Sequence, residues 1–272
     1  MPIDVASYLK FTPTDDTGSF AADAEGHVYY DDSESALKHY DGSSWAQVYP
    51  VNTVRPGDGQ YGADAYTKLL IHSDTSDAST TFTDSSSNDY SNTRYGNTQH
   101  KTAQKKIGAT SIYFDGTGDY LTSTASSLSS GDWTIDCWWM TTDITKTSSN
   151  ANTVSAGADF YHGIMFNAYN NDKMGIWLGD GSSWSICSGT HGTKTDWAND
   201  TWYHVALVFD GSTYKLYIDG VLDITVTSST SLGSSTSLFI GRWGVDAYYL
   251  EGYIDEFRMS SVARWTSNFV VY

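Results

Sequence analysis

The sequence predicts an all-β protein, and three observations lead to that class. First, two Asp-Gly dipeptides, Asp210-Gly211 and Asp219-Gly220, interrupt runs of strand-forming residues near the C-terminus. Asp-Gly accepts the positive φ angles of a tight type I′ turn, so both positions predict hairpins between antiparallel strands. Second, aromatic residues make up 15% of the 272 residues, with many Ser, Thr and Gly residues between them. Third, no segment combines sustained helical periodicity with a cap at each end.

The first part of the chain predicts a small β module. Short strands are expected over residues 26–30, 36–40 and 45–48, with polar turns between them. Three short strands with few apolar residues cannot form a self-sufficient core, so they need a partner surface. That surface is either the rest of the chain or other copies of the module, and the sequence therefore predicts an oligomer.

A boundary is predicted near residue 60. All four prolines lie in the first 56 residues, whereas nine of the ten tryptophans and both cysteines follow. The stretch from Pro50 to Gly62 is rich in Gly and Pro, which is typical of a linker. We therefore expect an N-terminal module with its linker over residues 1–60 and one large domain over residues 61–272.

The large domain predicts a series of strands joined by short polar turns. In chain order, strands are expected over residues 67–72, 111–114, 134–141, 162–168, 173–178, 184–187, 202–209, 213–218, 221–226, 237–240, 251–259 and 269–271. In one of them, Tyr214, Leu216 and Ile218 alternate with polar or amphipathic neighbours, as in a strand with one buried face. So many strands without helices predict a two-sheet sandwich or a barrel.

Charge and hydropathy exclude several kinds of partner. The net charge of −17 would repel phosphate backbones, so nucleic-acid binding is not expected. The acidity serves either solubility or the binding of divalent cations. No apolar run approaches the ~20 residues of a membrane helix, and the N-terminus lacks the segments of a signal peptide. We expect synthesis in the cytosol and no membrane insertion.

The two cysteines, Cys137 and Cys187, do not form a disulfide framework. Each lies in an apolar or aromatic strand. Two buried free thiols and a single bridge between sheets both fit this pattern.

No strong catalytic pattern is present. The chain lacks a Gly-x-Ser-x-Gly elbow, a His-Glu-x-x-His motif and a P-loop, and its seven histidines have no metal-ligand spacing. Glu251 and Asp255 share a strand face, but strand rise alone separates their Cα atoms by ~13 Å. Retaining glycosidases need carboxyl groups only ~5–5.5 Å apart. We therefore expect no enzymatic activity, and we expect Glu256 to form a structural ion pair with Arg258.

Aromatic residues in polar loops are candidates for ligand binding. Trp184 lies between Gly181-Ser182-Ser183 and Ser185, and Trp243, Tyr248 and Tyr249 lie in one mixed loop. Sugar binding on a β sandwich uses an exposed aromatic face with polar groups beside it. The alternative is that Trp243 and Tyr249 pack beneath their own loop.

Residues 26–48 resemble a short β motif of bacteriophage tail-fibre and other virion appendage proteins. The matching pieces are Gly26-His-Val-Tyr-Tyr30, Ala36-Leu-Lys-His-Tyr40 and Asp41-Gly-Ser-Ser-Trp45. The alternative is a chance hairpin of common turn residues. The resemblance implies a module that attaches to other virion proteins and assembles as a homotrimer.

Residues 64–272 resemble the laminin-G-like branch of the concanavalin A-like jelly rolls. The matching pieces occur in the family's order over residues 68–72, 82–86, 111–121, 132–139, 202–206, 214–220, 240–242 and 252–258. The closing residues 262–269 resemble variants common in marine phage and bacterial proteins. This resemblance implies two antiparallel sheets packed face to face, with binding sites on the concave face or the rim loops.

The same family commonly holds Ca²⁺ at the rim, through carboxylates and backbone oxygens. Asp84 and Asn88 offer alternating oxygens, and Asp115 and Asp119 flank Gly116-Thr117-Gly118. These four residues are the candidate ligands. The alternative is a pair of turns stabilised by Asp side chains without a metal.

Together these observations predict a non-enzymatic bacteriophage virion protein of the tail-fibre, appendage or decoration type. Residues 1–60 would attach it to the particle, and the jelly-roll head would recognise a host surface glycan or neighbouring virion proteins. One alternative is a purely structural capsid decoration or tail cement protein without sugar binding. Another is a secreted bacterial carbohydrate-binding module.

Overall fold

The structure is a computed structural model. It describes residues 28–31, 36–40, 45–48, 62–125, 128, 131–145, 152–157, 162–167, 172–234, 237–243 and 248–271. Residues 50–61 of the predicted linker lie outside this described part. The chain divides into two compact units, Met1–Tyr61 and Gly62–Tyr272.

The first unit contains one antiparallel sheet. Its strands are β1 (Val28–Asp31), β2 (Ala36–Tyr40) and β3 (Trp45–Val48), in the order β1-β2-β3. The three short strands of the sequence prediction are therefore present.

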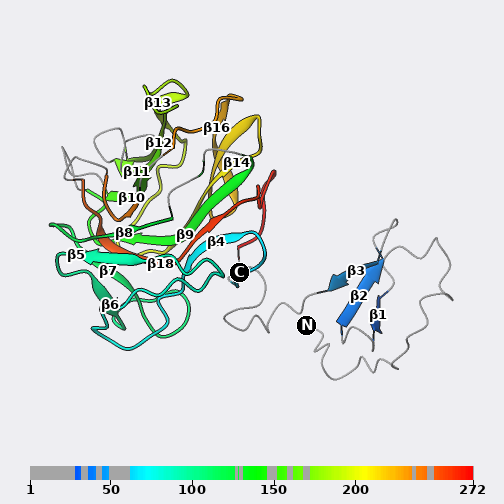
Figure 1. Ribbon diagram of the computed structural model, residues 1–272, viewed down its shortest axis with the longest axis horizontal. Helices are drawn as coiled ribbons and strands as arrows, with labels where there is room; N and C mark the ends of the chain where they lie inside the picture. The colour runs from blue at the N-terminus through cyan, green and yellow to red at the C-terminus, as the bar shows by residue number, and fades with distance from the viewer. Residues whose placement is uncertain are drawn as a thin grey trace. The chain divides into compact units, whose positions relative to one another are not determined.

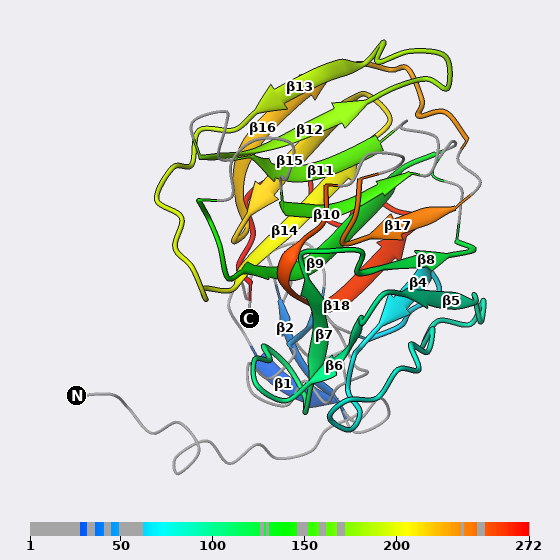
Figure 2. The ribbon, with the colours of Figure 1, turned by 90° about the vertical axis from the view of Figure 1, so that its left-hand side faces the viewer.

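The second unit is a sandwich of two antiparallel sheets, and the predicted all-β jelly-roll class is confirmed. The seven-stranded sheet runs in the order β13 (Cys187–His191), β12 (Lys173–Leu178), β11 (His162–Asn167), β10 (Asn152–Gly157), β17 (Leu238–Ile240), β8 (Tyr120–Ser123) and β5 (Asn92–Tyr95). The eight-stranded sheet runs in the order β16 (Val221–Thr227), β15 (Thr213–Ile218), β14 (Tyr203–Phe209), β9 (Trp133–Thr141), β18 (Glu251–Ser260), β7 (Ser111–Asp115) and β6 (Gln99–Lys101), with β4 (Thr67–Ile71) also paired to β18. The sheets form separate layers in Figure 1, and Figure 2 shows the seven-stranded sheet from β13 to β5.

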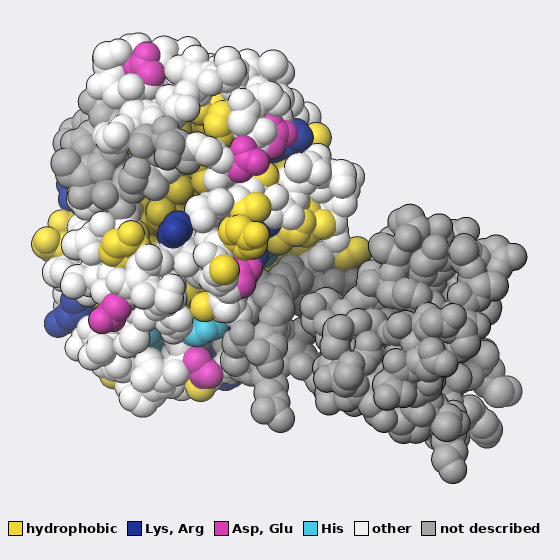
Figure 3. Space-filling view, turned by 45° about the vertical axis from the view of Figure 1, so that its right-hand side comes forward, with side chains coloured by type: hydrophobic (Ala, Val, Ile, Leu, Met, Phe, Trp, Pro, Cys, Tyr) yellow, Lys and Arg dark blue, Asp and Glu magenta, His cyan; other side chains and the backbone are white. Residues whose placement is uncertain are grey.

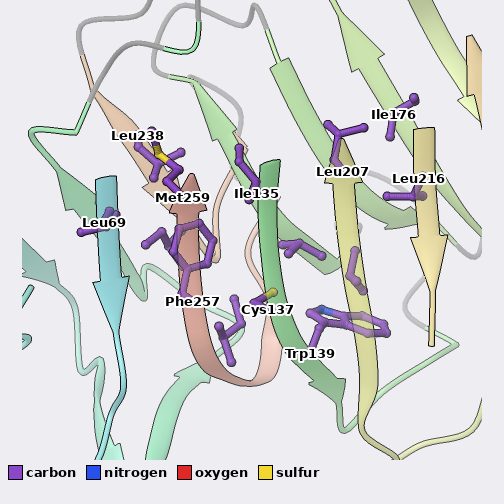
Figure 4. Packing of buried hydrophobic residues seen from close by; sticks show 14 of the residues in the cluster. Leu69, Ile135, Cys137, Trp139, Ile176, Leu207, Leu216, Leu238, Phe257 and Met259 are labelled. Atoms are coloured by element: carbon purple, nitrogen blue, oxygen red, sulfur yellow. The ribbon is translucent and has the colours of Figure 1, made fainter. Parts of the chain in front are cut away.

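The core lies between the two sheets and follows from strand alternation. In β9, Ile135, Cys137 and Trp139 point inward and are each at most 1% exposed. Ile176 of β12 and Leu238 of β17 belong to the same cluster, as Figure 4 shows. Burying a side chain of this size contributes ~1.5–3 kcal/mol, so this layer supplies much of the stability. Alternation then sends every second residue of each strand to the outer face of its sheet.

The two Asp-Gly turns differ from each other. At Asp219-Gly220 both residues have positive φ, as the predicted type I′ turn requires. Asp210-Gly211 is not such a turn. Phe209 pairs with Tyr214, which leaves a four-residue loop, and the Asp210 carboxylate accepts the backbone N–H groups of Ser212 and Thr213. The Asp side chain, rather than a two-residue turn, closes this hairpin.

Two predicted strands were misplaced. The strand expected at residues 184–187 begins only at Cys187, because the Asp180 carboxylate holds residues 180–183 in a turn by accepting N–H groups of Ser182 and Ser183. Residues 269–271 do not form a strand. Phe269 instead stacks on Trp265 with ring centroids 4.0 Å apart, and its N–H binds the Gly220 carbonyl.

The cysteines are both free thiols. Cys137 is buried in the core, and Cys187 is half-buried at the start of β13. Of the two possibilities that the sequence left open, the structure therefore has free thiols, with Cys187 less buried than expected.

The C-terminal segment covers the outer face of the eight-stranded sheet along β14 and β15. Trp265 and Phe269 pack with Ala206, Val208 and Tyr217, which all point outward from that sheet. The carbonyl of Phe269 lies so close to Gly220 that a Cβ there would clash with it. The tail therefore closes this part of the face to ligands.

Buried charges lie farther along the same face. Arg258 donates two hydrogen bonds to Asp136, at 3.0 and 2.9 Å, and both residues are almost fully buried. Burial opposes ionisation, yet the Arg258 guanidinium holds the pKa of Asp136 below its usual range. The Glu256–Arg258 ion pair that the sequence predicts is replaced by this pair. Glu256 binds Nδ1 of His72 at 2.8 Å instead.

A β-bulge explains why Glu256 has a different partner. The register of β18 against β9 shifts between Asp255 and Arg258, and Glu256 has a φ of 51°. Both carboxylates of the bulge are buried. Asp255 lies beneath Lys106 and Ile107, whose backbone N–H groups donate to its Oδ2 at 2.9 and 3.0 Å.

Replacement of Arg258 by Met should lower the free energy of unfolding by ~3–5 kcal/mol, because it leaves the Asp136 charge buried without its partner. The double variant Asp136→Leu/Arg258→Met should be more stable than the single variant. As a control, Asp196→Ala removes a carboxylate that is 86% exposed and paired with Lys194, and should cost at most ~1 kcal/mol. Urea denaturation measures all three. An Arg258→Met loss no larger than that of the control would contradict this account.

The bulge also predicts that stability falls as pH rises. The hydrogen bond to Glu256 raises the pKa of His72 above 6.5, and burial raises the pKa of Asp255 to about 8. Both groups bind protons more tightly in the folded chain than in the unfolded chain. Their stabilising contribution is therefore present at low pH and is lost as pH rises through the folded-state pKa values.

Between pH 6.5 and 8.5 the urea midpoint of the natural chain should therefore decrease. His72→Gln keeps a donor for Glu256 but does not titrate, so its midpoint should decrease less over this range. A midpoint that rises with pH, or an identical slope in both proteins, would refute the assignment.

Candidate functional site

Exposed hydrophobic side chains do not by themselves locate a site. They reach the surface of the second unit and gather near the middle of the side seen in Figure 3, and apolar atoms are common on all protein surfaces. Strand register is more informative, because it shows which aromatic side chains share an outer face. Along the seven-stranded sheet, the outward positions carry two groups of aromatic side chains.

Tyr95 and Tyr120 form the first aromatic group on this face. They are directly paired across β5 and β8, and their rings stack with centroids 4.3 Å apart and planes 2° apart. Tyr95 is 42% exposed. Phe239, the outward residue of β17, meets the edge of the Tyr120 ring at 5.6 Å. The stacked pair thus offers a flat, accessible aromatic surface at one end of the sheet.

A tryptophan cluster forms the second group. Trp177 points outward from β12, and its ring lies 5.4 Å from that of Trp243 in a T-shaped contact. Trp184 packs on Trp243 at 5.8 Å, and Tyr248 joins the cluster. Trp177 and Trp184 are half-buried, whereas Trp243 is only 5% exposed. Trp243 therefore supports the Trp177 and Trp184 rings from below, whereas residues 244–247 of its own loop lie outside the described part of the chain.

Glycines make room for the Trp177 ring. A Cβ at Gly175 would approach Trp177 to 3.0 Å, and one at Gly189 would approach the indole nitrogen to 2.9 Å. His191 meets the same ring edge-on at 5.4 Å. The indole ring thus lies across β12 and β13, where Gly175 and Gly189 leave room for it and His191 contacts its edge.

The structure brings three of the four predicted residues together. Trp184, Trp243 and Tyr248 share the tryptophan cluster. Tyr249 belongs to the first group, where it lies 6.2 Å from Tyr120. A bridge between Arg242 and Tyr249, with a hydrogen bond from the Trp243 N–H to the Tyr248 carbonyl at 3.0 Å, connects the two groups.

Sequence reasoning missed Tyr95, Tyr120, Trp177 and Arg242. Trp177 had a usable signal, because it alternates with Ile176 and Leu178 in an expected strand. Tyr95 and Tyr120 had none, because β5 and β8 are short, polar and not predicted as strands.

The candidate calcium ligands lie in two separate turns. Asp84 accepts the backbone N–H groups of Leu70, Ser86 and Tyr90, and the Asn88 amide donates to the carbonyls of β4. These contacts fasten the segment after β4 to the strand itself. Among the described residues no group of three or more His, Cys, Asp or Glu side chains is arranged to hold a metal ion.

Asp115 and Asp119 form the turn between β7 and β8. Asp119 is fully buried and accepts the N–H groups of Asn97 and Asp115, while Asp115 accepts the N–H of Thr117. Burial raises the pKa of Asp119, with the Asp115 charge acting in the same direction. Both carboxylates thus accept hydrogen bonds from backbone N–H groups of this turn, and Asp119 also accepts one from Asn97 after β5.

A hollow lies beside His72, away from the aromatic groups. It has a volume of roughly 200 Å³ and is lined by Ser73, Asp74 and His100 among others. Ser73 Oγ lies 2.6 Å from Nδ1 of His100, whose Nε2 lies 2.9 Å from the Thr81 carbonyl. Ser73 is only 4% exposed, so this pair lies beneath the surface of the hollow.

The carboxylates of β18 are arranged for structure. Register against β7 and β9 places Glu251, Tyr253 and Asp255 on the outer face of the eight-stranded sheet. Glu251 is half-buried at the start of the strand, opposite Asp115, and Asp255 is buried beneath Lys106 and Ile107. The pair is therefore separated along one strand and does not line a shared cleft.

No described helix is long and apolar enough to cross a membrane.

Comparisons with solved structures show the same fold. Domain 4 of an extracellular arabinanase from Geobacillus stearothermophilus, in complex with arabinotriose, is 22% identical with a TM-score of 0.53, over 73% of this chain and 93% of that one. The receptor-binding domain of botulinum neurotoxin mosaic serotype C/D is 14% identical with a TM-score of 0.55, over 74% of this chain. The chain spans about half of that domain, 48%.

The binding domain of botulinum neurotoxin serotype D gives a similar result, with 13% identity, a TM-score of 0.54 and coverage of 73% and 49%. No curated protein sequence matches the chain. The profile of the laminin-G family described as the concanavalin A-like lectin/glucanases superfamily matches residues 115–267, which is more than half of the 272 residues. The chain therefore belongs to this laminin-G family of the concanavalin A-like superfamily.

Proposed function

We propose that the second unit binds glycans without catalysing a reaction, on the outer face of its seven-stranded sheet. One observation carries this proposal. The strands β5, β8, β17 and β12 each present one aromatic ring at a described outward position, and Tyr95 and Trp177 remain accessible. Parts of the opposite outer face are covered by the C-terminal segment and by the loop around Lys106.

The chemistry of the face suits sugars. Aromatic rings provide flat apolar area against the C–H faces of a sugar ring, and nearby polar groups fix the hydroxyls. Thr93 and Thr122 lie beside the tyrosine pair, and Ser188 is exposed beside Trp177. The arabinanase domain, a neighbour in fold, was solved with a bound arabinotriose, which supports a sugar as the ligand class.

The absence of catalysis is part of the proposal. A retaining mechanism needs two carboxyl groups ~5–5.5 Å apart around the scissile bond. Glu251 and Asp255 are four residues apart along β18, a rise of ~13 Å. Asp255 is also fully buried and bonded to three backbone N–H groups, those of Lys106, Ile107 and Glu256. A sugar has no access to it.

We further propose that the whole chain is a bacteriophage virion protein of the appendage or decoration type. The tail-fibre-like pattern of residues 26–48 supports this role, as does the three-stranded sheet that these residues form. A sheet of three short strands needs a partner surface, which favours attachment and trimer formation through residues 1–60. In the main alternative, a structural decoration protein, the aromatic face binds a neighbouring virion protein instead of a glycan.

Replacement of Tyr95 by Ala should weaken glycan binding about tenfold, equivalent to about 1.4 kcal/mol, because it removes the exposed half of the stacked pair. Trp184→Ala should have a similar effect at the other end of the face. Tyr66→Ala is the matched control, since Tyr66 is 55% exposed but precedes β4 of the other sheet.

Binding would be measured by isothermal titration with the best ligand from a glycan array, and unchanged thermal unfolding would confirm that each variant folds. Equal losses of glycan affinity in Tyr66→Ala and Tyr95→Ala would contradict the proposal that the outer face of the seven-stranded sheet binds the glycan. Release of reducing ends from the same ligand by the natural chain would show that it is an enzyme after all.

The 272-residue chain should form a trimer in solution, with three times the 29.9 kDa mass of one chain. Light scattering after size-exclusion chromatography measures this mass directly. A monomer at micromolar concentration would contradict oligomerisation through the N-terminal module. Cryo-electron microscopy of phage particles would then decide whether the chain belongs to the virion.

A further inference from the structure

The acidic residues of the second unit are divided unequally between its sheets. Not one residue in the seven strands of the seven-stranded sheet is Asp or Glu. The strands of the other sheet contain six, namely Asp115, Asp136, Asp223, Glu251, Asp255 and Glu256. In a chain with 32 acidic residues and a net charge of −17, the aromatic face is thus built on a sheet without acids.

Two cationic side chains are present on that face. Lys173 of β12 is half-buried at an outward position. Arg242 follows β17 after Gly241 and lies between the two aromatic groups. His191 of β13, beside Trp177, is a neutral donor or acceptor, because burial lowers its pKa. The face therefore has local positive charge although the whole chain is strongly negative, and such local charge attracts anions at short range.

Arg242 is held in a cradle of aromatic rings. Its guanidinium carbon lies 4.7 Å from the ring centroid of Tyr120, 5.3 Å from that of Phe239 and 5.7 Å from that of Tyr249. Contacts of this kind fix the plane of a guanidinium without using up its N–H donors. The bridge between Arg242 and Tyr249 fixes the backbone as well.

The Arg242 guanidinium is hydrogen-bonded to the Tyr120 side chain, but not all of its donors have acceptors. Among the described residues its Nε is buried without a hydrogen-bond partner, and no carboxylate pairs with it. The other described arginines are satisfied. Arg258 binds Asp136, Arg264 binds Asp64, and Arg94 donates to the carbonyls of Gly96 and Thr98. A half-buried guanidinium with a free donor, held among rings that favour sugars, is arranged to receive an anionic group from outside the chain.

We infer that the aromatic face selects anionic glycans, and that Arg242 binds their acidic group. This inference rests on the proposed glycan binding and specifies its ligand class. The planar fork of a guanidinium fits a carboxylate with two parallel N–H···O bonds, so carboxylated sugars such as uronic acids are the expected ligands. A sulfate group can also accept two hydrogen bonds from a guanidinium, so the experiment includes sulfated sugars as a separate class.

The test is a glycan array that carries neutral, carboxylated and sulfated glycans, probed with the 272-residue chain. We expect carboxylated glycans among the strongest ligands. The best of these is then compared with its carboxyl-reduced neutral form by isothermal titration, and the acidic form should bind at least tenfold more tightly.

Arg242→Gln should remove this tenfold preference, so that the acidic and the reduced forms bind with equal affinity. Arg242→Lys, which keeps the charge but not the fork, should lose part of it. Arg94→Gln is the matched control, because it removes a cation from β5 of the same sheet, and it should keep the preference. Thermal unfolding verifies that the variants are folded.

The possible outcomes distinguish a failure of the anionic-ligand inference from a failure of the proposed glycan binding. If neutral glycans bind as tightly as acidic ones, or Arg242→Gln keeps the preference, the inference about anionic ligands is overturned while glycan binding stands. If Arg94→Gln and Arg242→Gln lose the preference equally, general charge rather than Arg242 is responsible. If no glycan of any class binds, the proposed function itself fails, and the inference fails with it.

Discussion

The packing of one sheet against the other is the constraint on which the rest of the molecule depends. Ile135, Cys137 and Trp139 can be buried only if Asp136 and Trp138 point away from the core. The same rule applies to the other sheet, where the burial of Ile176 and Leu178 forces Trp177 outward. The core thus determines the outer faces, and each outer face must either be covered or be used.

The eight-stranded sheet is largely covered. Its outward positions carry Asp136, Arg258 and the two carboxylates of the β18 bulge, which the chain neutralises internally through ion pairs and backbone N–H groups. Trp265 and Phe269 cover the part over β14 and β15. Buried charges in such a network require their partners, so this face contributes to the stability of the fold. The other sheet carries no acids, needs no such compensation and can leave its rings accessible.

Much of the fold could be predicted from the sequence. Long strands such as Tyr203–Phe209 are indicated by their own strand-forming residues. The Asp219-Gly220 dipeptide indicates its turn, because both residues accept positive φ. Strands without that signal were not found. β10 consists of Asn152–Gly157, whose small and polar residues are buried by their neighbours rather than by their own hydrophobicity. The prediction of a type I′ turn at Asp210-Gly211 was wrong. The Asp210 side chain closes this hairpin by accepting two backbone N–H groups, and a two-residue turn is not needed.

The candidate site could be predicted only in part, for a related physical reason. The sequence places Trp184, Trp243 and Tyr248 in polar loops. Their side chains form one cluster only together with Trp177 of β12, which was not predicted as part of the site. The Tyr95–Tyr120 stack depends on the pairing of β5 with β8, whose residues are about 25 positions apart in the chain. Pairing partners of this kind are fixed by tertiary structure and leave no local pattern.

The division between the two sheets also bears on the proposed absence of catalysis. Catalysis on such a sheet would require two carboxyl groups held at short separation in a place that a sugar can reach. Here the strand carboxylates belong to the sheet whose outer face is largely covered, and the accessible sheet has none in its strands. What the accessible face does have is flat aromatic area, hydroxyl groups and one guanidinium that no described residue neutralises. These groups suit the proposed recognition of a ligand whose apolar faces and charge both match, and no described strand of this sheet contributes a carboxyl group to a retaining pair.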